Sequence, residues 1–207
     1  MRNAAFALAL FLSSVSLAAE VRTYSITDDG KNYATFESAA TLETIKGITT
    51  KVTGTIVADP QDIASSRAEV TIDLASIDTG IAMRNEHLRD RFLEVSKFPT
   101  ATFKSVSVDG PKTAAPNKPL EIRVTGDFTI HGVTRRITVP VRVVYIPESE
   151  LTKSSRGPGD WIHATATFPV RLADHGITVP ERLILKLADT VDVKLDVFAV
   201  SRPPKAE

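Results

Sequence analysis

In the stretch LEIRVTGDFTI, Leu120–Ile130, apolar side chains alternate with polar ones, and this pattern indicates the fold class. Successive side chains of an extended strand point to opposite faces of a sheet. The stretch therefore predicts a β-strand with one apolar face and one face in water. Its apolar positions are Leu120, Ile122, Val124, Phe128 and Ile130, Gly126 falls on the same face, and the alternate positions Glu121, Arg123, Thr125, Asp127 and Thr129 are charged or carry hydroxyl groups.

The same alternation returns along the rest of the chain. It is clearest in residues 137–145, 162–172 and 191–199, and strands are also predicted at residues 33–38, 51–57, 68–74 and 100–108. With residues 120–130 this makes about eight strands, separated by breaks that contain Gly or Pro. Such a series predicts an all-β fold, either a sandwich or an up-and-down antiparallel barrel.

The first residues, 1–18, predict a signal peptide. Arg2 supplies a positive charge, residues 4–17 form an apolar run, and Ser16-Leu17-Ala18 is the small-x-small pattern that a signal peptidase accepts. No later run is long and apolar enough to anchor the chain. We therefore expect residues 19–207 to form a single exported domain, periplasmic or secreted, without an integral membrane segment after signal removal.

An outer-membrane barrel also alternates, with apolar residues toward lipid and polar residues toward the lumen. Here charged residues such as Glu121, Arg123 and Asp127 would crowd that lumen, and the chain ends in a polar RPPKAE tail. The pattern favours a water-soluble barrel with an apolar interior.

Charge and cysteine content exclude several classes of function. Lys plus Arg and Asp plus Glu number 25 each, and loss of Arg2 with the signal leaves a formal charge of −1. This balance, with no basic run, argues against a nucleic-acid partner. The absence of cysteine excludes disulfides and thiolate metal sites.

The apolar interior has two interpretations. Inward residues most often form a packed core. Small residues on or beside the apolar faces could instead leave a ligand cavity, or they could relieve crowding in the barrel. These small residues are Gly54, Ala101, Gly126, Ala164 and Ala166.

A charged segment with helical spacing, RNEHLRDRFLEVSKFPTATFKS at residues 84–105, interrupts the strands. Apolar residues recur in it at spacings of three, four and seven, which predicts a helix with a narrow apolar stripe against the barrel end. Asp78 or Thr79 is the expected N-cap, and Phe98-Pro99 returns the chain to an extended conformation. We expect a lid or crossover. The stripe consists of Ile81, Leu88, Phe92 and Val95.

Arg84, His87 and Arg91 follow the same spacing and predict a basic stripe. Arginine offers several fixed donors to phosphate oxygens, so the stripe could meet an anionic headgroup. The alternative is a solvated helix face, on which the arginines pair with neighbouring acidic residues.

The stretch GDFTIHGVTRRITVPV, residues 126–141, predicts a hairpin that turns at His131-Gly132, where glycine permits a positive φ. The four histidines, His87, His131, His163 and His175, lie on different elements without metal-ligand spacing. No metal site and no cofactor are therefore expected.

These two stretches, together with the strand spacing, resemble the YceI-like family of mostly small exported bacterial proteins. The resemblance implies a lipocalin-like eight-stranded antiparallel barrel with a short helix between strands and a long apolar cavity for isoprenoid chains. The chain departs from the family pattern near residues 28–54, which lack histidine, and at FPVRLADHGI, residues 168–177. The resemblance therefore implies a class of lipid and leaves the particular lipid open.

The leading hypothesis is a noncatalytic carrier or scavenger of an amphiphilic long-chain lipid, such as a polyisoprenoid or an isoprenoid quinone. The alternative is a stress-response or protein-interaction module with a packed interior. An enzyme is disfavoured because neighbouring acidic residues and histidines on one element rarely converge on one substrate atom. A monomer or a homodimer is expected. The candidate ligand-binding residues are Phe36, Ile72, Arg84, Leu88, Arg91, Phe92, Phe103, Val124, Phe128, Val141, Ala164, Ala166 and Phe168.

Overall fold

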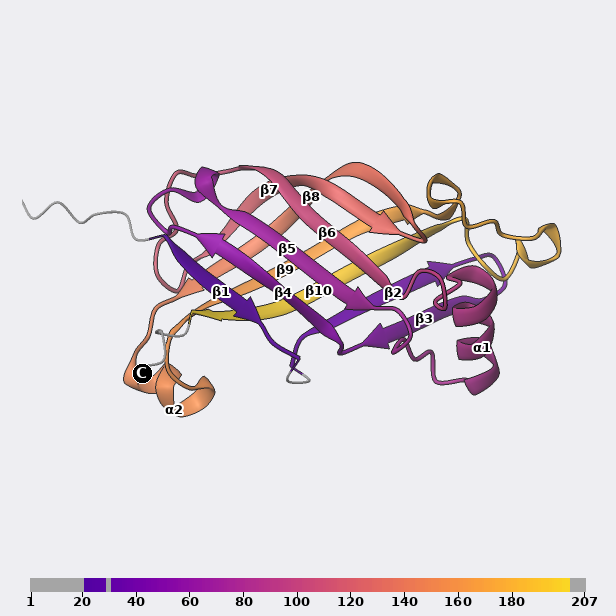
Figure 1. Ribbon diagram of the computed structural model, residues 1–207, viewed down its shortest axis with the longest axis horizontal. Coiled ribbons are helices and arrows are strands. Elements are labelled where there is room, and N and C mark those ends of the chain that lie inside the picture. The colour runs from indigo at the N-terminus through magenta and orange to yellow at the C-terminus, as the bar shows by residue number, and fades with distance from the viewer. Residues whose placement is uncertain (1–20, 29–30, 202–207) are drawn as a thin grey trace, which may run out of the picture.

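The computed structural model describes residues 21–28 and 31–201, which form a closed antiparallel β-barrel (Figure 1). The expected eight-stranded barrel with a short helix is confirmed. The sheet runs in the order β1-β4-β5-β6-β7-β8-β9-β10-β2-β3, and β1 pairs with β10 to close it. Its strands are β1 (Arg22–Ile26), β2 (Tyr33–Ala39), β3 (Thr44–Thr49), β4 (Val52–Ala58), β5 (Arg67–Asp73), β6 (Thr100–Asp109), β7 (Pro119–Ile130), β8 (Val133–Ile146), β9 (Asp160–Arg171) and β10 (Thr190–Ser201).

Ten strands fill eight barrel positions because two positions are each divided between two strands. Along β10, Asp192–Asp196 pairs with β2, whereas Ala199 and Val200 pair with β1. In the next position, β3 pairs with β2 and β4 pairs with β1. Each pair of short strands therefore acts as one long strand with an interruption.

A buried asparagine bridges the interruption between β1 and β2. Asn32 is buried, its side-chain nitrogen donates to the carbonyl of Thr27, and its side-chain oxygen accepts from the backbone N–H of Phe198. Phe198 lies on β10 between the residues that pair with β2 and those that pair with β1. The asparagine thus satisfies a buried backbone donor that neither strand reaches.

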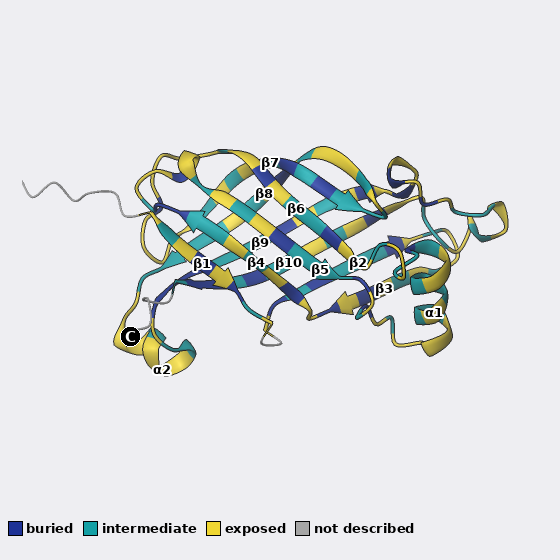
Figure 2. Ribbon diagram, in the orientation of Figure 1, coloured by how far each residue is buried: buried dark blue, intermediate teal, exposed yellow. Residues whose placement is uncertain are grey.

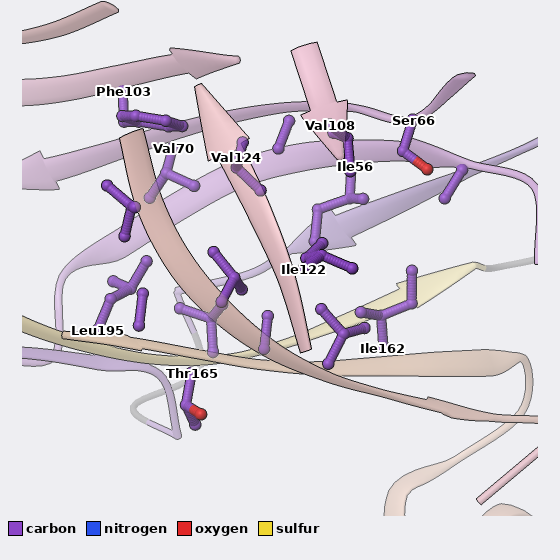
Figure 3. A pocket seen from close by; sticks show the side chains of 18 of the residues that line it. Ile56, Ser66, Val70, Phe103, Val108, Ile122, Val124, Ile162, Thr165 and Leu195 are labelled. Atoms are coloured by element: carbon purple, nitrogen blue, oxygen red, sulfur yellow. The ribbon is translucent and has the colours of Figure 1, made fainter. Parts of the chain in front are cut away.

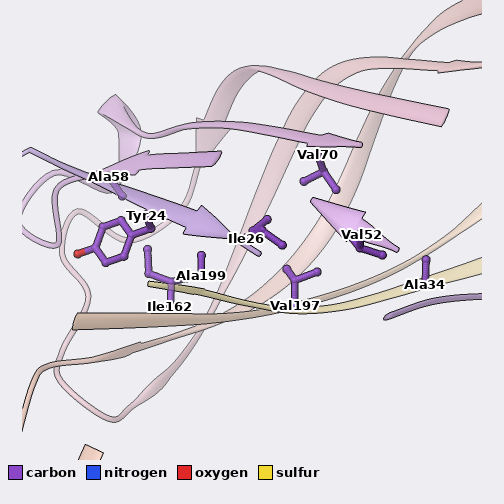
Figure 4. Close-up of a cluster of buried hydrophobic side chains, with 9 residues drawn as sticks. All are labelled: Tyr24, Ile26, Ala34, Val52, Ala58, Val70, Ile162, Val197 and Ala199. Atoms are coloured by element: carbon purple, nitrogen blue, oxygen red, sulfur yellow. The ribbon is translucent and has the colours of Figure 1, made fainter. Parts of the chain in front are cut away.

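Burial alternates along the strands as the sequence pattern predicts (Figure 2). Buried side chains form two hydrophobic clusters in the interior. One surrounds Tyr24, Val52 and Val197 (Figure 4), and the other surrounds Leu74, Phe128 and Val170. The apolar interior of the barrel therefore consists of two clusters rather than one.

The two ends of the barrel differ. One end, here called the lid end, carries α1 (Ala82–His87), the β2–β3 turn and the segment between β9 and β10 (Figure 1). The opposite end carries α2 (Glu150–Arg156), and two loops meet there because Ile63 donates to the carbonyl of Lys112 and Ala114 to that of Pro60. We call it the capped end. Across residues 21–28 and 31–201, the structure contains no helix whose length and hydropathy would suit a membrane span.

The predicted helix forms, but it differs from the expectation in two ways. Its N-cap is Ile81, which makes no side-chain capping bond, so the prediction of Asp78 or Thr79 is wrong. Asn85 instead reaches back, accepting from Thr79 and donating to Asp78. After His87 the chain continues as a π-helical turn, Leu88–Phe92.

Candidate ligand-binding cavity

Two apolar cavities lie inside the barrel. The narrow cavity, toward the capped end, has a volume of about 150 Å³, and inward side chains such as Ile56, Val70, Ile122 and Leu195 surround it (Figure 3). The wide cavity, at the lid end, has a volume of about 630 Å³ and lies between the barrel wall, α1 and the segment before β10. The lining of the narrow cavity is almost wholly aliphatic and aromatic, and that of the wide cavity is mostly so but also includes Glu43, Arg84, His87 and Lys186.

Four residues line both cavities, so the two spaces meet end to end. These are Ile72, Ala101, Phe128 and Val193, which come from four different strands. We call this ring the waist. A flexible chain that lies in the wide cavity would have to pass the waist to reach the narrow one.

The structure places the predicted side chains along these cavities with one exception. Phe103, Val124, Val141, Ala164, Ala166 and Phe168 line the narrow cavity, Phe36, Arg84, Leu88 and Phe92 line the wide cavity, and Ile72 and Phe128 belong to the waist. Arg91 lines neither cavity and is exposed. Alternation along strands thus identified inward side chains, although whether they bind a ligand is a separate question.

The π-helical turn explains why Arg91 departs from the expected basic stripe. An α-helix brings residues seven apart to the same face, whereas a π turn inserts an extra residue into the hydrogen-bonded ring and rotates later side chains. Because this turn begins at Leu88, it separates Arg91 from Arg84 and His87. The predicted stripe is therefore wrong beyond His87.

Arg84 holds the helix against the β2–β3 turn. Its Nη1 donates to Glu43 at 3.1 Å, its Nε to the hydroxyl of Thr79 at 3.0 Å, and its Nη2 to the carbonyl of Thr79 at 2.8 Å. His87 and Lys186 line the same cavity. Several of the guanidinium donors are consequently engaged with the protein itself.

The small inward residues serve both of the purposes that the sequence left open. Ala101, Ala164 and Ala166 line cavities, so their size leaves space. A Cβ on Gly126 would lie 2.5 Å from the ring of Phe103, and one on Gly54 would collide with the carbonyl oxygen of Glu69. The alanines thus shape the cavities, while these glycines permit close packing of the wall.

The charged helical stretch and the hairpin meet at the lid end. His131 Nε2 lies 3.0 Å from the carboxylate oxygen of Glu94, and His131 Nδ1 lies 3.1 Å from the carbonyl oxygen of His175. The ring of Phe98 stands edge-on to His131 and lies over Gly132. Three segments far apart in sequence therefore lock together below the lid.

The Glu94 carboxylate should contribute to stability in a pH-dependent way. Hydrogen bonds from Lys97 and then from His131 lower the pKa of Glu94 below its usual range. Because the folded-state pKa is depressed, the contribution is present above the unfolded-state value of about 4.3 and is lost as the pH falls through the folded-state pKa. We expect Glu94→Gln to lower the free energy of unfolding at neutral pH and this deficit to shrink in acid, as measured by denaturant titration across that range.

Asp90→Asn provides the control, because Asp90 is an exposed carboxylate on the same helical segment. It should leave stability unchanged at each pH. A deficit for Glu94→Gln that stays constant from neutral pH into acid would contradict the assignment.

At the capped end, polar side chains form a hydrogen-bonded cluster. Asp160 is buried, accepts from the backbone N–H of Glu148 at 2.8 Å and from the Tyr145 hydroxyl at 3.0 Å, and pairs with Arg22. Burial, with smaller effects of Tyr145 and Asp160, raises the pKa of Tyr24 above its usual range. Tyr145 also lines the narrow cavity, so this cluster marks its far end.

His163 and His175 also have structural partners. His163 Nε2 bonds to Asp196 at 2.9 Å and its ring stacks on Phe198, while His175 Nδ1 bonds to the carbonyl of Val133 at 3.0 Å. Among the described residues, no group of three or more His, Asp or Glu side chains is placed to hold a metal ion.

The segment before β10 supplies cavity residues that the sequence analysis missed. Leu183, Lys186 and Leu187 line the wide cavity, and Ser38 on β2 accepts from the backbone N–H of Ala188 to fix this segment in place. The signal in the sequence is the apolar run LIL at residues 183–185, which follows Pro180 in a region without strand alternation.

Comparison with known proteins identifies the family. The model of the YceI-like domain matches residues 24–199. A UPF0312 protein of Vibrio parahaemolyticus is 28% identical over 208 residues, covering 98% of this chain and 100% of its own. Protein YceI of Escherichia coli is 38% identical over 94 residues, 44% of each chain.

Solved structures share the fold. Burkholderia cenocepacia BcnA superposes with a TM-score of 0.67 at 24% identity, over 84% of this chain and 99% of its own. A polyisoprenoid binding domain from Saccharophagus degradans gives a TM-score of 0.65 at 18% identity, over 88% and 100%. The family model spans most of the chain, including every barrel strand in whole or in large part, and the chain therefore belongs to the YceI-like family.

Proposed function

We propose that this protein is an exported carrier or scavenger of a long-chain amphiphilic lipid of the isoprenoid type. The observation that carries the proposal is the pair of apolar cavities that share the waist residues Ile72, Ala101, Phe128 and Val193. A lipid-binding barrel is supported by the family and by the fold shared with the polyisoprenoid binding domain of Saccharophagus degradans. Export rests on the signal pattern of residues 1–18, which lie outside the described residues.

The sizes of the two cavities suit a ligand with a broad part and a slender part. A cavity of about 150 Å³ lined by aliphatic and aromatic groups stays dry and takes an apolar guest as small as benzene. The narrow cavity has this volume, and the wide cavity is about four times larger. A branched hydrocarbon tail in the narrow cavity, with the bulkier portion of the molecule in the wide one, fits both.

Binding of this kind needs no reacting group. Removing a long chain from water gains free energy with every methylene that the cavity covers. The barrel wall supplies backbone hydrogen bonds from strand to strand, so the lining can remain apolar. The role proposed here is therefore noncatalytic: the apolar lining holds the ligand, and Arg84 at the wide cavity is bonded to Glu43 and Thr79.

Native mass spectrometry of protein purified from its own exported fraction tests the proposal. We expect an adduct that is released by organic extraction and identified as a long-chain isoprenoid. Protein that is homogeneous and ligand-free, and that also fails to take up an added polyprenol or quinone, would leave the packed-interior interaction module as the function.

The headgroup contact is proposed at Arg84 alone. Of the two arginines predicted to meet a headgroup, Arg84 lines the wide cavity and Arg91 does not. Arg84→Ala should weaken binding of a polyprenyl phosphate about 3–10-fold more than binding of a neutral quinone, because a charge-assisted hydrogen bond is lost only with the phosphate. Titration with both ligands measures the difference.

Arg91→Ala is the matched control and should bind both ligands as the parent does. Equal losses for the two ligands in Arg84→Ala would show instead that Arg84 acts only by holding the helix against Glu43.

A further inference from the structure

Exposed aliphatic side chains gather at the lid end. Leu42, Ile81, Met83, Ile184 and Leu185 are between 51% and 67% exposed, and we call these five residues the apolar rim. Large aliphatic side chains in water are individually ordinary on a protein surface, but a group of them at one place marks an interaction site.

The rim belongs to three segments that are held together. Leu42 lies in the β2–β3 turn, Ile81 and Met83 lie at the start of α1, and Ile184 and Leu185 lie in the segment before β10. The backbone N–H of Leu42 donates to the carbonyl of Leu185 at 2.8 Å. These three segments project from the same end of the barrel in Figure 1.

The rim is continuous with the wide cavity. Ile81 and Met83 are exposed and also line that cavity, as does Leu183 beside Ile184. Apolar side chains thus continue from the interior to the outside at these positions, beside the polar lining residues Arg84, His87 and Lys186. A ligand that leaves the cavity here would enter water unless an apolar surface or the interior of a membrane lies against the rim.

The composition of the rim favours a lipid surface over a protein. Protein-binding hot spots are enriched in Trp, Tyr and Arg, whereas the rim consists of Leu, Ile and Met. The rim residues lie in turns and at the start of a short helix, and aliphatic side chains presented in this way can be buried at the boundary between headgroups and acyl chains of a bilayer.

The charges around the rim are of both signs. Arg182 and Lys186 stand beside Glu181, and Arg84 is paired with Glu43. These three basic and two acidic residues do not form the cluster of basic residues that strong binding to anionic headgroups would require. Attachment should therefore depend on apolar insertion and change little with salt.

From these observations we propose that the apolar rim docks the lid end on an electrically neutral lipid bilayer. The inference rests on the proposed function for its purpose, since docking would let a lipid pass between membrane and cavity without crossing water. The docking itself depends only on the exposed side chains.

Cosedimentation of the full exported chain with phosphatidylcholine vesicles tests the docking. The test variant combines Leu42→Ser, Ile184→Ser and Leu185→Ser, three rim residues that do not line either cavity. We expect it to lose vesicle binding by about tenfold or more, because three large aliphatic side chains no longer leave water. The binding of the parent should change less than about twofold between low and high salt, since no charge attraction contributes.

Leu151→Ser is the matched control. Leu151 is 79% exposed on α2, at the capped end, so its replacement removes an equally accessible leucine from the other side of the molecule. It should bind vesicles as the parent does, and circular dichroism should show the same β-rich fold for all three proteins.

Three outcomes would overturn the docking proposal: a parent that does not sediment with neutral vesicles, equal losses in the rim variant and in Leu151→Ser, or a rim that instead captures a protein while ignoring vesicles. Binding of a short-chain prenol in vesicle-free solution is measured separately. A parent protein that binds vesicles but not the prenol would count against the carrier function alone. A parent protein that binds the prenol but not vesicles would count against docking alone.

Discussion

Replacing Ala166 with Phe should remove retention of a long-chain lipid, with a loss of apparent affinity of about 100-fold. Ala166 is buried on β9 and lines the narrow cavity, whose volume is about 150 Å³. Because a space of that order accommodates a benzene molecule, the added ring would occupy the volume proposed for the tail. Native mass spectrometry and titration with a polyprenol measure the loss, and Ala164→Phe should behave similarly.

The stability of the Ala166→Phe protein separates a cavity from a packed core. In a filled interior the ring would overpack and lower the free energy of unfolding by about 1–3 kcal/mol. In an empty cavity the ring makes new contacts, and stability should stay near that of the parent or rise. Thr167→Phe is the control, since Thr167 is the exposed neighbour on the same strand. A destabilised Ala166→Phe protein whose parent never carried lipid would refute the carrier proposal.

Replacing Gly132 with Ala should lower the free energy of unfolding by about 2–4 kcal/mol, because backbone strain and overpacking add at this position. His131 and Gly132 form the two-residue turn between β7 and β8, with φ values of 53° and 71°. Two positive φ angles are characteristic of the type I′ turn, which matches the twist of a hairpin. A Cβ on Gly132 would also lie 2.5 Å from the ring of Phe98. Denaturant unfolding measures the loss.

Gly80→Ala isolates the contribution of that contact. Gly80 has a φ of 76°, close to that of Gly132, but a Cβ there would meet nothing within 4 Å. Gly80→Ala should therefore lower the free energy of unfolding only by the backbone strain of a positive φ, about 1–2 kcal/mol. Equal costs at the two glycines would mean that the Phe98 contact adds nothing and that the turn alone sets the effect.

Much of the barrel could be predicted from the sequence because alternation is a local property. The eight predicted strands correspond to β2 and to β4 through β10, often within one or two residues. β1 and β3 were missed because each has only five or six residues and completes a barrel position with a second short strand. Such pairings depend on partners far away in the chain, which no short window of sequence contains.

The cavity lining on the strands was predictable for the same reason, whereas the lining supplied by the lid end was not. On a strand, side chains point alternately to the two faces of the sheet, so Val124 and Ala166 could be assigned to the interior directly. The helix offered no such certainty, because a π turn moved Arg91 away from the cavity. The segment that contributes Leu183 and Leu187 has no periodic pattern, and its position depends on contacts such as the one from Ala188 to Ser38.

The loops that meet at the capped end, through Ile63 and Ala114, bear on the kinetics of exchange. If a lipid fills both cavities, its tail enters first and its exit retraces the same path past Phe128 and the lid. A second lipid does not enter from the capped end, where the loops meet. Replacement therefore follows first-order kinetics: its rate is set by dissociation of the bound lipid and does not depend on the concentration of the competitor. The residence time of the bound lipid would then lengthen with each additional isoprene unit that must pass the waist. The protein would thus discriminate between lipids by the length of their tails, through the rate at which they leave.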